Sequence, residues 1–470
     1  MTLLHLAAKE GTVKSIRFFL NSLKGHETIL KSLLEATTTY HDKETALHLA
    51  AAGGYLDVVQ WLVEHGKANV EATNKYGTTV LHNAAQGNEL AVVQWLVEHG
   101  KANVEATNKY GMTVLHYAAQ GNELDVVQWL VEHGKANIEA TNKYGRTVLH
   151  YAAQENKLDV VQWLVEHGKA NVDATDNDGM TVLHYAAGWN KLDVVQWLVE
   201  HGKANVDATN KYGRTVLHYA AQENKLDVVQ WLVEHGKANV EATNNDGMTV
   251  MHYAAGWNKL DVVQWLVEHG KANVDATDND DMTVLHYAAQ GNELDVVQWL
   301  VEHGKANIEA TNKYGRTVLH YAAQENKLDV VQWLVEHGKA NVEATNNDGM
   351  TVMHYAAGWN KLDVFQWLME HGKANVDATD NDGWTVLHYA AQRNKWDVVQ
   401  WFVEHGKANV EATDNDGRTV LHYAAIRNEL DVVQWLVEHG KANIEATDID
   451  GKTPLNLAEE RKHKKITEYL

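Results

Sequence analysis

A histidine returns every 34 residues along most of this chain, and this fixed period constrains the fold more than any other feature. The histidines that keep it are His48, His82, His116, His150, His184, His218, His252, His286, His320, His354, His388 and His422. Such a period is typical of supersecondary units that stack and bury their apolar faces against one another. We therefore expect one repeat array, in place of several independent domains, along the 470 residues.

Both ends of the chain depart from the period. His5 precedes His48 by 43 residues, so nine extra residues lie within residues 21–44. The chain closes with a partial repeat that begins at Thr453 and carries charged residues where the other repeats are apolar, as a terminal cap would. We expect a single array of about fourteen repeats, with an irregular repeat in residues 1–44, twelve regular repeats in 45–451 and a capping repeat in 452–470.

The first part of a regular repeat predicts a short helix. In residues 101–134, Thr113 is a good N-cap for a helix over residues 114–120. Its small packing face consists of Leu115, Ala118 and Ala119. Asn122 follows where the chain must reverse, and asparagine is the residue other than glycine that best tolerates a left-handed backbone.

The second part predicts another helix, over residues 123–133, and then an arm. The apolar stripe of this helix consists of Leu124, Val127, Leu130 and Val131. Gly134 is expected to end the helix as a C′ glycine, which is a left-handed position. Residues 135–146 follow as an extended arm that turns at Gly145. Because neither helix is long enough to persist alone in water, each repeat needs its neighbours.

The order Thr-x-Leu-His-x-Ala-Ala, then Leu-Asp-Val-Val-x-x-Leu-Val, then His-Gly resembles the ankyrin repeat, and it covers nearly the whole chain except roughly residues 21–44. The resemblance implies an all-α solenoid of helix-turn-helix repeats with projecting β-turn arms, curved into a superhelix. It also implies that the histidine of Leu-His hydrogen-bonds the turn backbone and the next repeat. The sequence departs from the family pattern in two ways. Only Pro454 keeps the usual proline after the capping threonine, and the residue that lengthens the period is placed in Gly-Lys-Ala-Asn-Val, where we expect a kinked arm.

Composition narrows the possible partners and locations. Lys and Arg number 41 against 63 Asp and Glu, giving a formal charge of −22 that repels phosphate backbones and anionic lipid. Without cysteine, neither a disulfide nor a thiolate metal site can form. No apolar run approaches membrane-spanning length, and the repeat pattern begins at once without a leader. These features predict a cytoplasmic protein and leave the nucleus, or delivery into a host cytoplasm, open.

The sequence offers no pattern typical of catalysis, a cofactor or a metal. Of the 28 histidines, 24 occupy two fixed positions per repeat, which indicates a structural role. Gly168-Lys169 lacks the other residues of a phosphate-binding loop, and the acidic turn at Asp176 lacks the first and last ligands of a calcium loop. Twelve tryptophans recur in phase from Trp61 to Trp435, which predicts packing between repeats with part of each indole on the outer surface.

Comparison of the repeats with one another shows where residues vary: the turn tip, the residue after its glycine, and the two residues before the inter-helix asparagine. In ankyrin proteins these positions line the concave groove, and Trp and Arg are common interface anchors. The candidate contact residues are Arg146, Trp189, Arg214, Trp257, Arg316, Trp359, Trp384, Arg393, Arg418 and Arg427. Arg393, Lys395, Lys407, Arg418 and Arg427 also suggest an acidic or phosphorylated partner for the C-terminal third.

Duplication leaves a second interpretation of this variation open. Residues 206–277 nearly repeat at 308–379, so the tryptophan face is either a contact surface or copied surface without a partner. The sequence therefore predicts a monomeric, non-catalytic adaptor or scaffold that binds proteins, with a passive spacer or tether as the alternative. An enzyme would need a catalytic pocket in residues 21–44. Asp281 replaces a tip glycine and is expected to strain its turn.

Overall fold

The computed structural model describes residues 2–38, 42–121, 123–393 and 395–470, and the chain divides into two compact halves, residues 1–239 and 240–470. The helices of the N-terminal half are α1 (Leu3–Lys9), α2 (Val13–Ser22), α3 (Glu27–Glu35), α4 (Ala46–Ala52), α5 (Leu56–Glu64), α6 (Val80–Gln86), α7 (Leu90–Glu98), α8 (Val114–Gly121), α9 (Leu124–Glu132), α10 (Val148–Gln154), α11 (Leu158–Glu166), α12 (Val182–Gly188), α13 (Leu192–Glu200), α14 (Val216–Gln222) and α15 (Leu226–Glu234). Those of the C-terminal half are α16 (Val250–Gly256), α17 (Leu260–Glu268), α18 (Val284–Gly291), α19 (Leu294–Glu302), α20 (Val318–Gln324), α21 (Leu328–Glu336), α22 (Val352–Gly358), α23 (Leu362–Glu370), α24 (Val386–Gln392), α25 (Trp396–Glu404), α26 (Val420–Arg427), α27 (Leu430–Glu438), α28 (Pro454–Glu460) and α29 (Lys464–Tyr469).

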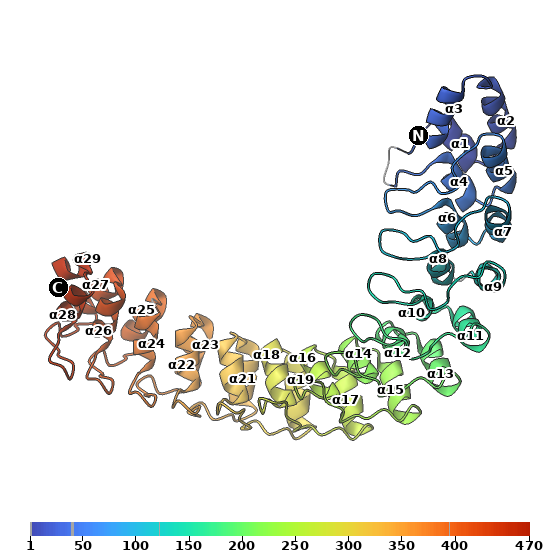
Figure 1. Cartoon of the computed structure of the whole chain (residues 1–470). Coiled ribbons are helices and arrows are strands. Elements are labelled where there is room, and N and C mark those ends of the chain that lie inside the picture. The colour runs from blue at the N-terminus through green and yellow to red at the C-terminus, as the bar shows by residue number, and fades with distance from the viewer. Residues whose placement is uncertain (1, 39–41, 122, 394) are drawn as a thin grey trace. The chain divides into compact units, whose positions relative to one another are not determined.

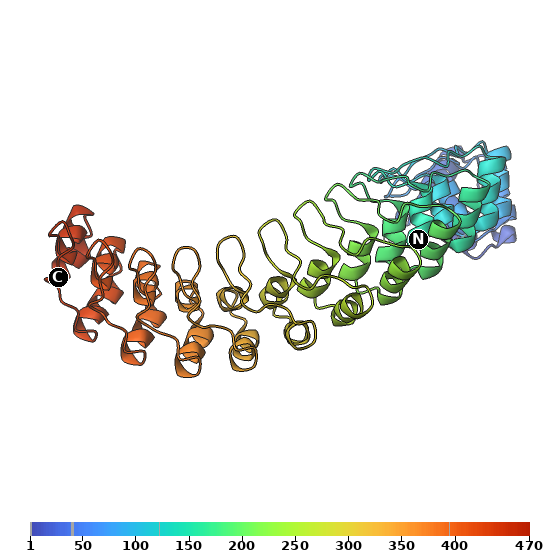
Figure 2. The same ribbon diagram turned by 90° about the horizontal axis from the view of Figure 1, so that it is seen from below.

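Within each half the helices form pairs, and each pair stacks on the next. In the N-terminal half, α4 packs against its partner α5 and against the first helix of the next pair, α6. The loops project on the side of the first helices, away from the second helices α5, α7 and α9 (Figure 1). In the C-terminal half the loops also project to one side of the helices (Figure 2). The expected all-α repeat solenoid is confirmed.

The first helix of each repeat begins at a threonine that is tied to the periodic histidine. Thr147 is extended (φ −83°, ψ 171°), and its N–H donates to Nδ1 of His150 at 3.1 Å. Because Nδ1 accepts, the ring proton is on Nε2, which lies 3.1 Å from the carbonyl oxygen of Met180 in the next repeat. The structural role expected for these histidines is thereby confirmed. Burial away from water lowers the pKa of His48, His82 and His116 to about 4.

The reversal between the two helices falls on the asparagine that the sequence indicated. Asn122 and Asn394 lie outside the described residues. At the equivalent position, Asn88, Asn156, Asn190, Asn224, Asn258, Asn292, Asn326, Asn360 and Asn428 all have φ between 55° and 71°. The prediction of a left-handed asparagine is confirmed in these repeats, and it follows from the low cost of that conformation for asparagine.

The end of the second helix differs from the prediction. Gly134 follows the cap residue His133, but the left-handed residue is Lys135, with φ 57°. Glycine is required at position 134 for space, because a Cβ there would lie 2.7 Å from the carbonyl oxygen of Leu130. The lysine turns back so that its Nζ donates to the carbonyl oxygen of Glu132 and satisfies the helix end. The arm therefore begins with a left-handed residue at this Gly-Lys step, and the kink expected relative to the family pattern stays a prediction.

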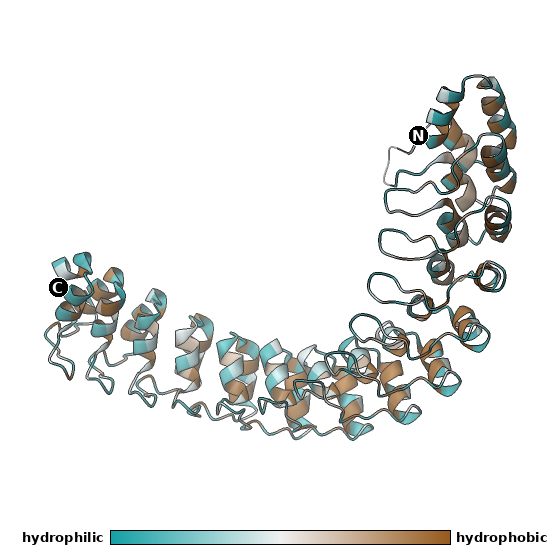
Figure 3. Ribbon diagram, viewed as in Figure 1, coloured by the Kyte–Doolittle hydropathy of each residue, from teal (hydrophilic) through white to brown (hydrophobic). Residues whose placement is uncertain are grey.

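The core is a row of small and branched side chains between the helices. Leu115, Ala118 and Ala119 of the first helix are buried, as expected. In the second helix the structure buries Val126, Val127, Trp129 and Leu130, whereas Leu124 and Val131 of the predicted stripe are half-buried. The stripe differs because the second helix packs both on its partner and on the second helices of adjacent repeats, here α7 and α11. Figure 3 shows the apolar faces of the helices and the polar loops.

The extra residues of the first repeat form a helix of their own. The insertion expected within residues 21–44 contains α3, and residues 39–41 of that range lie outside the described part of the chain. Leu34 is the buried residue of α3 and lies against the loop that ends α5, close to Gly66. The division of the chain into an irregular repeat, twelve regular repeats and a cap remains a prediction.

Candidate functional site

Each arm ends in a hydrogen-bonded tip that fixes the backbone of the variable residues. At one tip, Asn142 accepts from the backbone N–H groups of Tyr144 at 2.9 Å and Arg146 at 3.0 Å through Oδ1. Gly145 has φ 78°, a conformation that disfavours other residues. Thr141 and Thr147 close the arm through an antiparallel bridge. The tip is therefore a preformed support for its side chains.

Successive tips are joined by hydrogen bonds. The backbone N–H of Asn177 donates to the carbonyl oxygen of Tyr144 at 2.9 Å, one repeat earlier. Its side-chain Nδ2 also donates to the carbonyl oxygen of Lys143, at 2.9 Å. Where the adjoining first helix carries a tyrosine, it holds the first residue of the tip, as where the Tyr185 hydroxyl donates to Asp176 at 2.6 Å. The tips of one half thus form a continuous row, which we call the tip row.

The arginines after the tip glycine are held between repeats. Arg146 is half-buried, with its guanidinium 4.7 Å from the ring of Tyr185 in the next repeat and Nε 3.9 Å from the Asp176 carboxylate. Arg316 is also half-buried, 4.9 Å from the ring of Tyr355. Arg214 lies 5.8 Å from the ring of Tyr212 within its own tip. The cation–π contacts of Arg146 and Arg316 help to join neighbouring repeats, and these side chains are less available to a partner than exposed anchors would be.

Three of the C-terminal cationic residues have different surroundings. Arg418 donates to Asp416 at 3.0 Å and lies 3.5 Å from the carboxylate of Asp448. Arg393 lies over the indole of Trp359 at 5.3 Å. Arg427 is exposed in the last turn of α26. Arg418 already faces two carboxylates. Fewer cationic side chains are therefore available to the acidic or phosphorylated partner than the sequence suggested.

Three of the four predicted tryptophans are presented to solvent. Trp189, Trp257 and Trp359 are the C-cap residues of α12, α16 and α22, and more than half of each side chain is exposed, at 58%, 59% and 52%. Trp257 follows Trp189 by two repeats, and Trp359 follows Trp257 by three, so the three indoles belong to repeats that are not adjacent. Trp384 is half-buried, with its ring 4.4 Å from that of Tyr423. Trp384 therefore packs against a neighbouring repeat, whereas the other three indoles are exposed to solvent.

The exposed indole of Trp189 borders a pocket of about 360 Å³. The other residues that line it are Met180, His184, Tyr185, Gly188, Tyr219, Glu223 and Lys225. Two adjacent repeats thus contribute an apolar wall with one acidic and one basic side chain at its edge. At Trp359 the residue equivalent to Glu223 is Arg393, which stacks on the indole. Sequence comparison found the variable position of Glu223 but gave no sign that Lys225 shares its pocket.

The face made by the second helices carries a regular feature that the sequence interpretation missed. Each in-phase tryptophan is stacked on the histidine four residues later, as in Trp129 and His133, with ring centres 5.9 Å apart and planes 12° apart. The spacing of four residues on one helix was the available signal. Within the described ranges, no group of three or more His, Asp or Glu side chains is placed to hold a metal ion.

Comparison with known proteins gives one family. The model for ankyrin repeats (three copies) matches overlapping segments at residues 4–108, 67–142, 101–176, 135–210, 169–244, 201–278, 237–312, 305–380, 339–414, 360–448 and 397–470. A search of curated proteins gives no match to the chain. Among the helices of the described residues, none combines the length and the apolar character needed to span a membrane.

Proposed function

The chain belongs to the ankyrin-repeat family, and from this membership we propose that it is a non-catalytic scaffold that binds a partner protein. Ankyrin repeats are generally protein–protein interaction modules. The binding surface would be the turn-side face, which we define as the residues after the tip glycines together with the last and C-cap residues of the first helices. The acidic net charge of the chain and its lack of cysteine support the proposal that the protein is monomeric and cytoplasmic.

The observation that carries this proposal is the exposure of three indoles, one in the N-terminal half and two in the C-terminal half. Trp189, Trp257 and Trp359 sit where other repeats have Gly, Glu or Arg, so the fold does not need an indole there. Exposing so much apolar surface has no benefit for folding, whereas burying it against a partner would be favourable. The hydrogen-bonded tips keep the neighbouring backbone in place before a partner arrives, which reduces the ordering cost of binding.

The test is affinity purification of partners with the full chain and with a Trp189→Gln, Trp257→Gln, Trp359→Gln variant. Glutamine keeps the net charge and removes the indoles. A partner retained by the original chain and lost by the variant would support the proposal. A control, Glu166→Gln, Glu268→Gln, Glu370→Gln, places glutamine at three exposed positions at the ends of second helices; it shifts the net charge from −22 to −19 and should still retain a partner held by the indoles. Equal circular dichroism spectra and urea midpoints must first establish that all chains are folded.

A passive spacer is the second candidate function. It is favoured by the near repetition of residues 206–277 at 308–379, because this duplication copied Trp257 as Trp359 together with most of its own repeat. A spacer needs the stacked fold but no particular turn-side residue. Identical partner recovery with and without the three indoles would therefore favour the spacer.

A further inference from the structure

The second helix α25 begins with a residue found at no other equivalent position. The other regular repeats begin this helix with Leu56, Leu90, Leu124, Leu158, Leu192, Leu226, Leu260, Leu294, Leu328, Leu362 and Leu430, whereas α25 begins with Trp396. Trp396 is half-buried, and its ring lies 5.8 Å from that of Trp435 on α27, with the planes 88° apart. One substitution thus places two indoles at right angles on the second-helix face.

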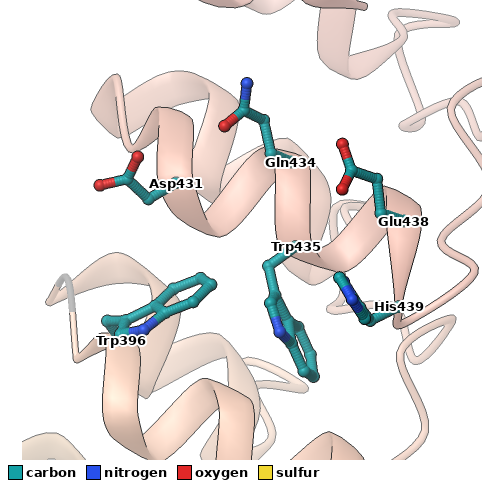
Figure 4. Close-up of a pocket in the computed structure, with 6 residues that line it drawn as sticks. All are labelled: Trp396, Asp431, Gln434, Trp435, Glu438 and His439. Carbon is teal, nitrogen blue, oxygen red and sulfur yellow. The ribbon is translucent and has the colours of Figure 1, made fainter.

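These indoles border a pocket of about 370 Å³ between α25 and α27. Its other lining residues are Asp431, Gln434, Glu438 and His439 (Figure 4). His439 is stacked on Trp435 at 5.4 Å, which holds that indole in place. The Glu438 carboxylate accepts from the Tyr469 hydroxyl at 3.0 Å, so it too is fixed by a neighbour. The pocket therefore combines aromatic walls with two carboxylates, and none of its lining residues is Lys or Arg.

The chemistry of these walls selects for positive charge. The faces of indole rings carry partial negative charge and attract cations, most strongly for tryptophan. Asp431 and Glu438 add full negative charges. These charges would repel an anion and would make no favourable interaction with a neutral apolar group. The net charge of −22 also raises the local concentration of cations around the array.

We propose that this pocket binds the cationic side chain, arginine or lysine, of a basic segment in a partner protein. The site lies on the second-helix face, so it is independent of the indoles proposed above for the turn-side face. The guanidinium or ammonium group would lie against the Trp396 indole and pair with the Asp431 carboxylate, and Glu438 would add negative charge at the far end of the pocket.

The other repeats provide a matched reference for this proposal. On α21 the residues Asp329, Gln332, Trp333, Glu336 and His337 repeat the α27 side of the pocket, but the opposing residue is Leu294. Trp396→Leu therefore introduces the residue that the other regular repeats have at this position, without a change of charge. Because eleven repeats fold with leucine here, the variant should fold normally.

The experiment measures fluorescence polarisation of labelled nine-residue Gly-Ser peptides that carry one central arginine, lysine or trimethyllysine, with citrulline as the neutral control. The full chain and Trp396→Leu are compared at about 150 mM salt, where non-specific attraction is partly screened. We expect the variant to bind at least one cationic peptide about threefold to tenfold more weakly, and the citrulline peptide to bind neither chain measurably. The three cationic peptides distinguish a guanidinium from an ammonium ligand.

A second pair of variants separates the pocket from general charge. Asp431→Asn and Asp329→Asn each remove one negative charge from the same helix position, but only Asp431 lines the pocket. We expect weaker binding of the cationic peptides for Asp431→Asn alone. Equal affinities of the original chain and Trp396→Leu, or equal losses for the two aspartate variants, would overturn the proposal in favour of non-specific attraction.

Discussion

The turn tips of the two halves are built on one backbone but differ in chemistry. In the N-terminal half, four of the five regular tips read Asn-Lys-Tyr, whereas six of the seven tips in the C-terminal half end in aspartate. The first tip row is therefore rich in lysine and tyrosine, and the second is a row of carboxylates. The comparison teaches that an array of nearly uniform repeats can change its edge without changing its core, because tip side chains are not needed for the helix packing.

The tips also differ in how firmly they are joined. A tip lysine such as Lys143 donates one backbone bond to the tip before it, at 2.9 Å from the Tyr110 oxygen. A tip asparagine such as Asn381 donates a backbone bond to Asp348 and a side-chain bond to Asn347, both at 2.9 Å. The asparagine tips, which are commoner in the C-terminal half, thus add a second bond to the backbone of the tip before them. A tip lysine can instead bond a carboxylate of the preceding tip, as Nζ of Lys313 does with Asp280.

This linkage accounts for the position of Asp281, the tip residue that replaces glycine. Asp281 keeps the left-handed backbone, with φ 59°, so the expected strain is present. The next tip carries Lys313 at its second position and places no asparagine side chain against residue 281. A Cβ on Gly349, which precedes the Asn381 tip, would lie 2.5 Å from the asparagine Oδ1. Replacement of the glycine is therefore tolerated best where the following tip is of the lysine type.

The largest effect expected is that of acid, which should destabilise both halves alike although their tips differ. The pKa values of His82 and His116 in one half, and His286 and His320 in the other, are lowered to about 4 from an ordinary value of 6.5. The unfolded chain therefore binds more protons, and stability that is complete above pH 6.5 is lost as the pH falls towards 4. Each histidine contributes about 1.4 kcal/mol per pH unit in this window. Urea midpoints across pH 4 to 7 would measure the loss.

The control for this effect comes from the last repeat, where Asn456 replaces the histidine and its Oδ1 accepts from the Thr453 N–H at 3.1 Å. His116→Asn should keep the cap and lose the bond to the next repeat, which costs about 1 kcal/mol at pH 7. Unfolding of this variant between pH 4 and 6.5 should also take up one proton fewer, so its free energy of unfolding should depend less steeply on pH. An unchanged pH dependence would contradict the role given to this ring.

Substitution of two tip glycines should sharpen the comparison. Gly349→Asp meets Asn381, whereas a Cβ on Gly77 lies 3.0 Å from the backbone nitrogen of Lys109. We expect losses of about 2 to 3 kcal/mol for Gly349→Asp and about 1 kcal/mol for Gly77→Asp, since both need a left-handed backbone and only the first displaces a bonded side chain. Thermal unfolding of the two variants measures the difference. Equal losses would show that the type of the following tip is irrelevant.

Exchange of the second tip residue should remove a side-chain hydrogen bond between tips in the C-terminal half and create one in the N-terminal half. Asn381→Lys removes the bond to Asn347 and should weaken local protection by about 1 kcal/mol, whereas Lys143→Asn should gain a similar bond to Lys109. Hydrogen exchange of the tip peptides, detected by mass spectrometry, reports these local free energies. The interpretation is wrong if protection of both tips stays the same.

The smallest expected effect is the repair of the irregular tip. Asp281→Gly should stabilise its turn by about 0.5 kcal/mol, because aspartate is among the residues that tolerate the left-handed region. Asp280→Gly, one residue earlier, serves as the control, since residue 280 is not in that region and its carboxylate accepts from Nζ of Lys313, so this variant should not slow exchange. Slower hydrogen exchange in the Asp281→Gly tip alone would agree with the expectation, and equal exchange in both variants would not.

The sequence by itself determined the features that depend on a few neighbouring residues. Thr113 as a cap, the asparagines that reverse the chain and the strained Asp281 are local, because cap bonds and left-handed backbones are set within one turn of chain. The family and the helix pairs followed from the same repeated local pattern.

Only the tertiary structure decided which variable side chains are free. Trp189 and Trp384 were equivalent candidates in the sequence, yet one is exposed and the other packs on Tyr423. Arg146 is held by Tyr185, and Trp396 becomes part of a pocket because Trp435 faces it from the next repeat. Each outcome depends on a side chain more than 30 residues away, and the exposure of a residue in a stacked array is set by that neighbour as much as by its own position.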